Sequence, residues 1–314
     1  MEISVIVPTF NRAHGLTDCI MHILSQEGME AVDWDLVIVD NNSSDSTAEL
    51  VRSLQMKYDG KIRYVFEPQQ GVSHARNRGI QSTDSRFLAY VDDDTLVEPN
   101  WLKAIYSTFE RNHGDAVGGR IWIRSPYRLP KWINEDMRGF LGHLDFGDAP
   151  FRMDGRKAYP FGANMAFDRR VFDRIGLFDV RIGRKGEGRK REELFKSEEP
   201  DLFRRLADAE GIIDYAPDAI SYHKILPHQL EKRFFRVLHF NEGYQKAVLS
   251  NDDFQRLILG VPPFLIRQAF VAAYEYALQV FARGVDQAFR QQMTLGYVVG
   301  SICGYHEKYS KNNS

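Results

Sequence analysis

Three consecutive carboxylates are the clearest chemical signal in this chain. Asp92, Asp93 and Asp94 directly follow an apolar run in the stretch RFLAYVDDDTLVEPNWL. Adjacent carboxylates repel one another, and such an oxygen-rich cluster is typical of a site for a hard divalent cation, Mg²⁺ or Mn²⁺, that could hold a diphosphate. The alternative is a solvated acidic turn that caps the next helix. The glycine and distal glutamate of an EF-hand are missing, which argues against a calcium loop.

Polar residues also follow the first two expected strands. A further charged residue, Arg76, lies in an expected helix that begins after Gly71. Amides and carboxylates at strand ends can hydrogen-bond a base or a ribose, although turn formation and helix capping remain the alternative for Asp40. Arg76 would aim a planar guanidinium at a nucleotide or at the aspartates, and its alternative is a surface arginine. The candidate ligand-site residues in these segments are Pro8, Thr9, Asn11, Asp40, Asn42 and Arg76.

The second half of the chain carries three further segments with candidate site residues. Small residues in YPFGANMAF would let the backbone approach a ligand, or would simply form a tight turn. Acidic residues in FKSEEPDLF suit a helix start, where the helix dipole alone could explain them. The lone His223 ends a strand-like run and is either structural or a metal ligand. The candidates in these three segments are Gly162, Ala163, Asn164, Glu198, Glu199, Asp201 and His223.

The elements around these residues alternate in a βαβ rhythm up to about residue 110, which predicts a mostly parallel sheet covered on both faces. Ligands of such sheets bind at the carboxyl ends of the strands, where the polar residues fall. From Pro227 onward only helical spacing occurs. The expected strands are Ile3–Pro8, Leu36–Asp40, Ile62–Phe66, Phe87–Val91, Ala116–Ile123 and Asn164–Phe167, with helices over 16–26, 46–58, 71–81 and 201–210.

Composition limits the function further. The 314 residues include 41 basic and 43 acidic ones, so the strongly basic balance of a nucleic-acid-binding protein is absent. Two cysteines, Cys19 and Cys303, imply no disulfide framework and favour a reducing cytoplasm. Neither a secretory signal nor a clean membrane span is visible. The first strand is not followed by G-x-G-x-x-G, which disfavours a nicotinamide dehydrogenase.

Four segments in order, ISVIVPTFNR, LVIVDNNSSDST, GVSHARNRGI and YVDDD, resemble glycosyltransferase family 2. The resemblance covers residues 1 to about 225 and implies an inverting enzyme with a GT-A fold, a Rossmann-like mixed α/β sheet flanked by helices. We therefore expect a catalytic domain over 1–225, divided into a nucleotide-sugar half (1–110) and an acceptor half (111–225), and a C-terminal helical extension over 226–314.

The resemblance also implies roles for the candidates. Asp92 and Asp93 would face the nucleoside and sugar, and Asp94 would bind the metal together with His223. The family usually has Glu-Asp at the start of the later helix, with the second acid as catalytic base. Here that position is Glu199, so the carboxylate is kept on a longer arm, and Glu198 is the second candidate. Asp201 and the Gly162–Asn164 segment would lie on the acceptor side.

The sequence thus predicts a metal-dependent transferase that moves a sugar from a nucleotide donor, with UDP favoured, to a glycan or lipid-linked acceptor in cell-surface polysaccharide synthesis. We expect a cytoplasmic protein and no nucleic-acid partner. Peripheral contact of the C-terminal helices with the inner face of the membrane and homo-oligomerisation both stay open. The alternatives are a catalytically silent nucleotide- or glycan-binding partner subunit and a sugar nucleotidyltransferase.

Overall fold

The structure, a computed structural model, describes residues 1–58, 60–186, 193, 195, 197–250, 252 and 254–312. The chain divides into two compact units. The first, called the catalytic unit below, comprises residues 1–124, 141–187 and 197–225. The second, called the helical unit, comprises residues 125–140, 188–196 and 226–314.

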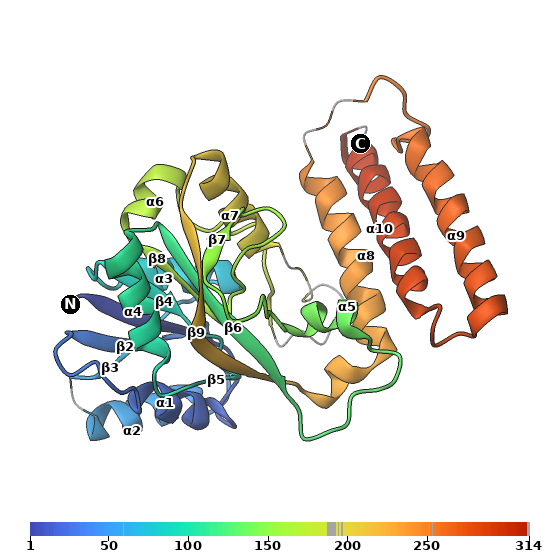
Figure 1. The fold of residues 1–314 in the computed structure, drawn as a ribbon. Coiled ribbons are helices and arrows are strands. Elements are labelled where there is room, and N and C mark those ends of the chain that lie inside the picture. Colours follow the sequence, from blue (N-terminus) through green and yellow to red (C-terminus); the bar gives the residue numbers. More distant parts are fainter. Residues whose placement is uncertain are drawn as a thin grey trace. The chain divides into compact units, whose positions relative to one another are not determined.

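A mixed sheet of nine strands forms the centre of the catalytic unit, counted over its described residues (Figure 1). Its path is β3-β2-β1-β4-β8-β6-β9-β5, and β7 pairs with β9. β1 to β4 are mutually parallel, β8 runs antiparallel to both β4 and β6, and β9 is parallel to β6 and antiparallel to β5 and β7. The strands are β1 Ile3–Thr9, β2 Trp34–Asp40, β3 Ile62–Phe66, β4 Phe87–Tyr90, β5 Thr95–Val97, β6 Ala116–Arg124, β7 Phe151–Met153, β8 Met165–Asp168 and β9 Ile213–Lys224.

Helices cover both faces of this sheet, as the apolar runs in its strands require. Side chains that alternate along β1 enter two separate apolar clusters, with Val5 on one face and Ile6 on the other. Helices α1, α2 and α4 pack on the first face, and α3, α6 and α7 pack on the second. Their bounds are α1 Leu16–Leu24, α2 Thr47–Lys57, α3 Val72–Gln81, α4 Trp101–Asn112, α6 Arg170–Ile175 and α7 Glu198–Asp208.

Three long helices dominate the helical unit. Helix α10 packs against both α8 and α9 and lies between them (Figure 1). None of the helices that the structure describes has the length and apolarity needed to cross a bilayer. The bounds are α5 Glu135–Arg138, α8 Lys232–Leu249, α9 Pro263–Arg283 and α10 Phe289–Asn312, with short 3₁₀ turns at Gly139–Leu141 and Pro227–Leu230.

The expected mixed sheet flanked by helices, with a helical C-terminal extension, is confirmed. Two short strands were missing from the sequence-based prediction. β5, of three residues, follows the aspartate triplet, and β7 is equally short. Such segments are too brief to establish a period-2 pattern. The division of the chain after residue 225 stays a prediction.

Candidate functional site

The aspartate triplet lies between β4 and β5, at the carboxyl end of the parallel part of the sheet. Parallel strands deliver their C-terminal residues to one edge, so the loops after β1 and β2 arrive beside the triplet. The hydroxyl of Thr9, the last residue of β1, donates to Asp93 Oδ2 at 2.7 Å. The side chains of Asp93 and Asp94 are 13% and 10% exposed, whereas that of Asp92 is 34% exposed. Asp92 is therefore the member most open to a ligand.

Arg12 binds two of the three aspartates. Its Nε donates to Asp93 Oδ1 at 3.1 Å and its Nη2 to Asp94 Oδ2 at 2.9 Å. Its backbone N–H donates to the hydroxyl of Thr47, which fixes the loop after β1 against α2. Arg12 is not among the site residues predicted from the sequence. The available signal was a permanently charged side chain immediately after Asn11 at the end of the first strand.

The surroundings of Asp93 and Asp94 shift the pKa values of these two carboxyl groups in opposite directions. Burial raises the pKa of Asp93 to about 6, although Arg12 favours its charged form. Burial would also raise the pKa of Asp94, but His223 and Arg12 together hold it well below its usual range. Arg184, whose carbonyl oxygen accepts from the N–H of residue 72, contributes to the same lowering. Asp94 is thus a stable anion, as a metal ligand should be.

His223 approaches Asp94 from β9, because Thr95 of β5 pairs with His223 in the antiparallel ladder. Its Nε2 lies 3.2 Å from Asp94 Oδ1, a buried oxygen without a well-formed hydrogen bond. Its Nδ1 lies 2.8 Å from the carbonyl oxygen of Leu141. Burial lowers the pKa of His223, but Asp94 raises it above its ordinary value, so without a metal Nε2 holds a proton toward Asp94. A bound metal would take the place of that proton while Nδ1 keeps its contact with Leu141, the usual arrangement of a histidine ligand.

The pair formed by Asp94 and His223 fits a divalent cation. Adjacent ligands of an octahedral ion with bonds of about 2.1 Å lie about 3 Å apart, close to the spacing of these two atoms. Within the described part of the chain, no group of three or more His, Cys, Asp or Glu side chains is arranged to hold a metal. Further ligands would therefore come from phosphate oxygens and water, as is common for Mg²⁺.

Arg76 connects the triplet to helix α7. Its guanidinium is 2% exposed. Nη1 lies 3.1 Å from Glu198 Oε1, while Nη2 lies 3.2 Å from Glu199 Oε1 and 3.4 Å from Asp92 Oδ1. Burial opposes its charge, but the three carboxylates raise the pKa of Arg76 above its ordinary value. The predicted orientation of Arg76 toward the aspartates agrees with these contacts, and the surface position weighed as its alternative does not.

The two glutamates at the start of α7 differ in exposure, and the pKa of Glu198 is shifted. The side chain of Glu198 is 6% exposed and that of Glu199 is 17% exposed. Burial and the neighbouring Glu199 carboxylate raise the pKa of Glu198 to about 8. At neutral pH Glu198 is therefore largely protonated, which leaves Glu199 as the better proton acceptor of the two.

Gly162 lies against this ion-pair cluster. A Cβ added there would overlap Arg76 Nη2 and would come within 2.5 Å of Glu199 Oε1. Only a residue without a side chain lets the loop approach both groups. Ala163, next to it, packs instead against Ile121 and Leu144 in a small apolar cluster.

Asn164 is completely buried in the core. Its Nδ2 donates to the carbonyl oxygens of Arg120 and Ala219 at 3.0 and 2.8 Å, and its Oδ1 accepts from Trp101 Nε1 at 2.8 Å. The expected contact with acceptor hydroxyls does not agree with this position. The amide satisfies groups inside the sheet, because its two donors and its acceptor match three buried partners.

The remaining donor-site candidates form the loops after β1 and β2. Pro8 is buried within β1. Asp40 is 1% exposed and accepts from the Ser43 N–H and the Tyr64 hydroxyl, so its turn-forming alternative is also realised. Asn11 accepts from the Ser44 N–H, and its φ of 51° is left-handed. Asn42, at φ 64°, is exposed and donates to the Pro68 carbonyl oxygen.

Asp201, one turn into α7, forms ion pairs with Arg204 and Arg205 at 2.8 and 2.9 Å. Arg205 also donates to the carbonyl oxygen of Leu177, so Asp201 orients an arginine that connects α7 to the segment around Leu177. The basic, glycine-containing segment over 184–190 is described only in part. Arg184 and Lys185 lie near the amino end of α3, whereas Arg189 and Lys190 lie outside the described residues.

Sequence comparison identifies relatives along most of the chain. The sequence model of the family described as glycosyl transferase family 2 matches residues 4–176. Glucosyl-dolichyl phosphate glucuronosyltransferase of Haloferax volcanii is 27% identical over 263 residues, which are 80% of this chain and 78% of the relative. Poly(ribitol-phosphate) beta-N-acetylglucosaminyltransferase TarP of Staphylococcus aureus is 29% identical over 150 residues, 47% of this chain and 44% of the relative.

Solved structures with the same architecture extend the comparison. Mannosyltransferase PcManGT from Pyrobaculum calidifontis, in complex with GDP-Man and Mn²⁺, has a TM-score of 0.60 at 18% identity and covers 96% of this chain and 85% of its own. TarS of S. aureus, residues 1–349 in complex with UDP, has a TM-score of 0.55 at 15% identity, with coverage of 99% and 92%. At these identities the likeness concerns the fold, which is GT-A. The chain belongs to glycosyl transferase family 2 and is a glycosyltransferase.

Proposed function

We propose that this glycosyltransferase moves one sugar from a nucleoside-diphosphate donor to a hydroxyl of a glycan or lipid-linked acceptor and inverts the anomeric centre. The observation that supports this proposal most directly is that one guanidinium, that of Arg76, contacts carboxylates of both the aspartate triplet and helix α7. Nη2 of Arg76 contacts both Asp92, on the donor side, and Glu199, at 3.4 and 3.2 Å. This contact holds a candidate base beside the aspartates that would face the donor sugar.

Glu199 is the proposed base. It would take the proton of the acceptor hydroxyl while that oxygen attacks the anomeric carbon from the face opposite the diphosphate, and a single displacement inverts the centre. Such proton transfer contributes roughly 10²–10⁴-fold to the rate. The glutamate arm is longer than the aspartate usual in the family, and the contact with Arg76 supplies its position. Gly162 leaves the backbone close to the carboxylate, where an acceptor hydroxyl would have to enter.

Asp94 and His223 would hold Mn²⁺ or Mg²⁺, which when bound neutralises charge on the departing nucleoside diphosphate. The chain adds fixed positive charge of its own. Arg12 contacts Asp93 and Asp94, and Arg184 is close enough to lower the pKa of Asp94. These arginines offset the negative charge of the triplet, so that an anionic donor can approach it.

The donor and acceptor classes follow from relatives and stay part of the proposal. UDP is favoured as the nucleotide, and the TarS structure was solved with UDP, whereas PcManGT was solved with GDP-Man. The name of the Haloferax relative specifies a dolichyl phosphate carrier, which supports a lipid-linked acceptor. We accordingly propose a role in cell-surface polysaccharide or glycolipid synthesis on the cytoplasmic side, with peripheral membrane contact through the helical unit.

Two measurements on the full chain test the proposal. Calorimetric titration of UDP, GDP and dTDP, with and without Mn²⁺, should show metal-dependent binding of one nucleotide by the wild type and its loss in Asp94→Ala. Glu199→Gln should retain that binding and lose at least 10²-fold in donor hydrolysis or transfer. Asp208→Asn, at the exposed end of the same helix, is the matched control. Full activity of Glu199→Gln would exclude Glu199 as the base, and binding of no nucleotide would refute the donor site.

A further inference from the structure

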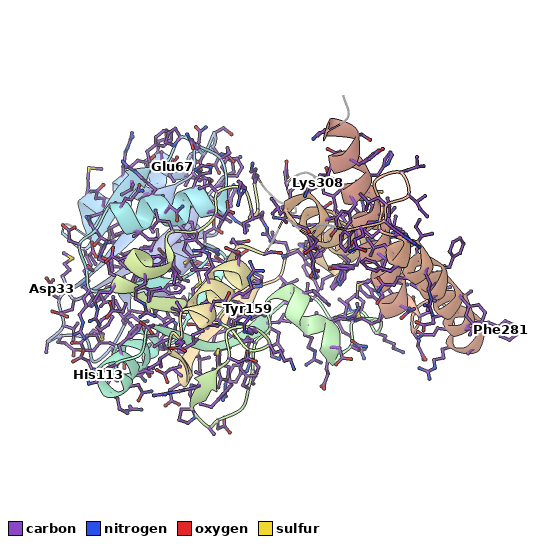
Figure 2. The ribbon with its side chains drawn as sticks, turned by 90° about the horizontal axis from the view of Figure 1, so that it is seen from above. Asp33, Glu67, His113, Tyr159, Phe281 and Lys308 are labelled. Carbon is purple, nitrogen blue, oxygen red and sulfur yellow. The ribbon has the colours of Figure 1, made fainter. Side chains whose placement is uncertain are left out.

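Helix α9 presents a broad apolar face to solvent. Leu265 and Ala272 on one side of the helix are buried. The opposite side repeats large apolar residues at helical spacing, with exposures from 47% to 93%. These residues are Phe264, Phe270, Val271, Tyr274, Leu278 and Phe281. Figure 2 shows Phe281 extending away from its helix into solvent. A helix that is apolar on both sides normally has a partner on both sides.

The turn before α9 continues this apolar surface. Leu257, Ile258 and Leu259 are 46%, 53% and 72% exposed. The turn is held in place, because Ile258 pairs with Val261 and the carbonyl oxygen of Leu259 lies 2.9 Å from His306 Nδ1 of α10. Leu259 adopts a left-handed φ of 49°, which is costly for a branched residue. The fold therefore fixes three consecutive aliphatic side chains where water surrounds them.

The charged residues around this apolar surface indicate which kind of partner it fits. Arg256, Arg267 and Arg283 are exposed along it, and Glu275 is its single acidic residue between 256 and 285. Ten basic and seven acidic residues occupy 226–314, whereas 31 basic and 36 acidic residues precede them. The C-terminal region is thus positive in a chain that is negative as a whole. Exposed arginines next to aromatic and aliphatic side chains suit anionic headgroups above an apolar layer.

We propose that the apolar face of α9 and the turn at 257–259 dock on the surface of an anionic lipid bilayer. The aromatic and aliphatic side chains would enter the boundary between headgroups and acyl chains, as interfacial helices do. The three arginines would extend toward lipid phosphates. Membrane docking deepens the proposed function, because a lipid-linked acceptor is presented at such a surface, and it rests on that function only for the acceptor class.

A second copy of the chain fits the same surface less well. Phe264, Val271 and Leu278 repeat every seven residues, a spacing that could align two helices. Arg267 lies in the same stripe, three residues after Phe264, and a parallel pair would bury it against its own copy. Like charges brought together at a dry interface are unfavourable. Such pairing would also leave the aliphatic turn at 257–259 outside the helical seam.

Vesicle flotation of the full chain tests the docking surface. Vesicles of phosphatidylcholine alone and of phosphatidylcholine mixed with phosphatidylglycerol are compared, without any nucleotide. We expect the wild type to float with the anionic vesicles and less with the neutral ones, and high salt to reduce the difference. The fraction of F270S/Y274S/F281S that floats with anionic vesicles should be at least tenfold lower than that of the wild type. R256Q/R267Q/R283Q should lose mainly the preference for phosphatidylglycerol.

M21S/M56S/V180S, which replaces exposed apolar residues of the catalytic unit, is the control and should float like the wild type. Circular dichroism and nucleotide titration without vesicles verify that each variant is folded, and they report the proposed function independently of lipid. Wild type that floats with neither vesicle, or an F270S/Y274S/F281S protein that floats normally, would overturn the proposal. So would a dimer that does not float and that the same variant converts to monomer in light scattering.

Discussion

Adding one methyl group at Gly162 perturbs the proposed base through packing alone. The φ of Gly162 is outside the left-handed region, so alanine imposes no backbone strain there. Its Cβ would lie 2.5 Å from Glu199 Oε1, whereas ordinary contacts begin at 3.4 Å. The carboxylate must therefore retreat by about 0.9 Å, and Arg76 Nη2 must also move.

The expected cost in Gly162→Ala follows from that displacement. A misplacement of about 1 Å can lower the rate of a positioned reaction by about 10²-fold. Overpacking of a filled site typically costs about 1–3 kcal/mol of stability. We expect turnover to fall by about 10²-fold and nucleotide binding to fall much less, because the three atoms nearest to the new methyl group belong to Arg76 and Glu199, and Arg76 is only one of the groups near the proposed donor site.

Kinetics of donor hydrolysis or transfer, together with nucleotide titration and urea denaturation, measure these three effects. Gly139→Ala is the control, because a Cβ at Gly139 meets no atom within 4 Å. Unchanged turnover in a folded Gly162→Ala protein would refute the reasoning that this glycine sets the position of Glu199. Equal losses in both glycine variants would point to a general effect on the fold instead.

Three further changes probe the same cluster. Arg76→Met should lower the free energy of unfolding by about 3–5 kcal/mol in urea denaturation, because it leaves the Glu199 and Asp92 carboxylates without their cation; an added Glu199→Gln that recovers nothing would contradict this cause. In the wild type, the raised pKa of Glu198 means that the folded state holds a proton that the unfolded state has lost, so this group's contribution to stability falls as pH rises from 4.5 to about 8. Glu198→Gln should flatten that part of the stability profile, and an unchanged slope would assign it to another group. His223→Gln should weaken Mn²⁺-dependent nucleotide binding by at least tenfold while metal-free binding is unaffected; a Mn²⁺ titration identical to that of the wild type would exclude His223 as a ligand.

Much of the sheet could be predicted because its parallel strands are continuous apolar runs. A strand buried on both faces leaves that mark in the sequence whatever its neighbours are. The same logic located the triplet, since acidic residues directly after such a run must lie at the carboxyl edge. The order of the later strands, in which β8 enters between β4 and β6, depends on contacts between distant segments that no local pattern records.

Side-chain direction limited the prediction of the site. Asn164 has the donors and acceptor that a sugar hydroxyl needs, and the same groups satisfy Trp101 and two backbone carbonyls in the core. The residue type alone does not show whether an asparagine binds a ligand or forms hydrogen bonds inside the core. Arg12 was missed for the converse reason, because a single arginine in a loop is usually solvated. Only the meeting of the β1 loop with the triplet gives Arg12 two carboxylate partners.

Two acids on one arginine explain how adjacent glutamates can differ in protonation and in the roles proposed for them. Ser197, just before α7, has a left-handed φ of 98°, and the helix begins at Glu198, so both glutamates point their carboxylates at Arg76 from neighbouring positions. One guanidinium charge cannot balance two buried anions, and the more buried Glu198 retains its proton. Glu199 then shares Nη2 with Asp92, which is the aspartate most exposed to solvent. We expect a donor that draws Asp92 away from Arg76 to strengthen the remaining contact with Glu199, so that the proposed donor site and the proposed base would be coupled through one side chain.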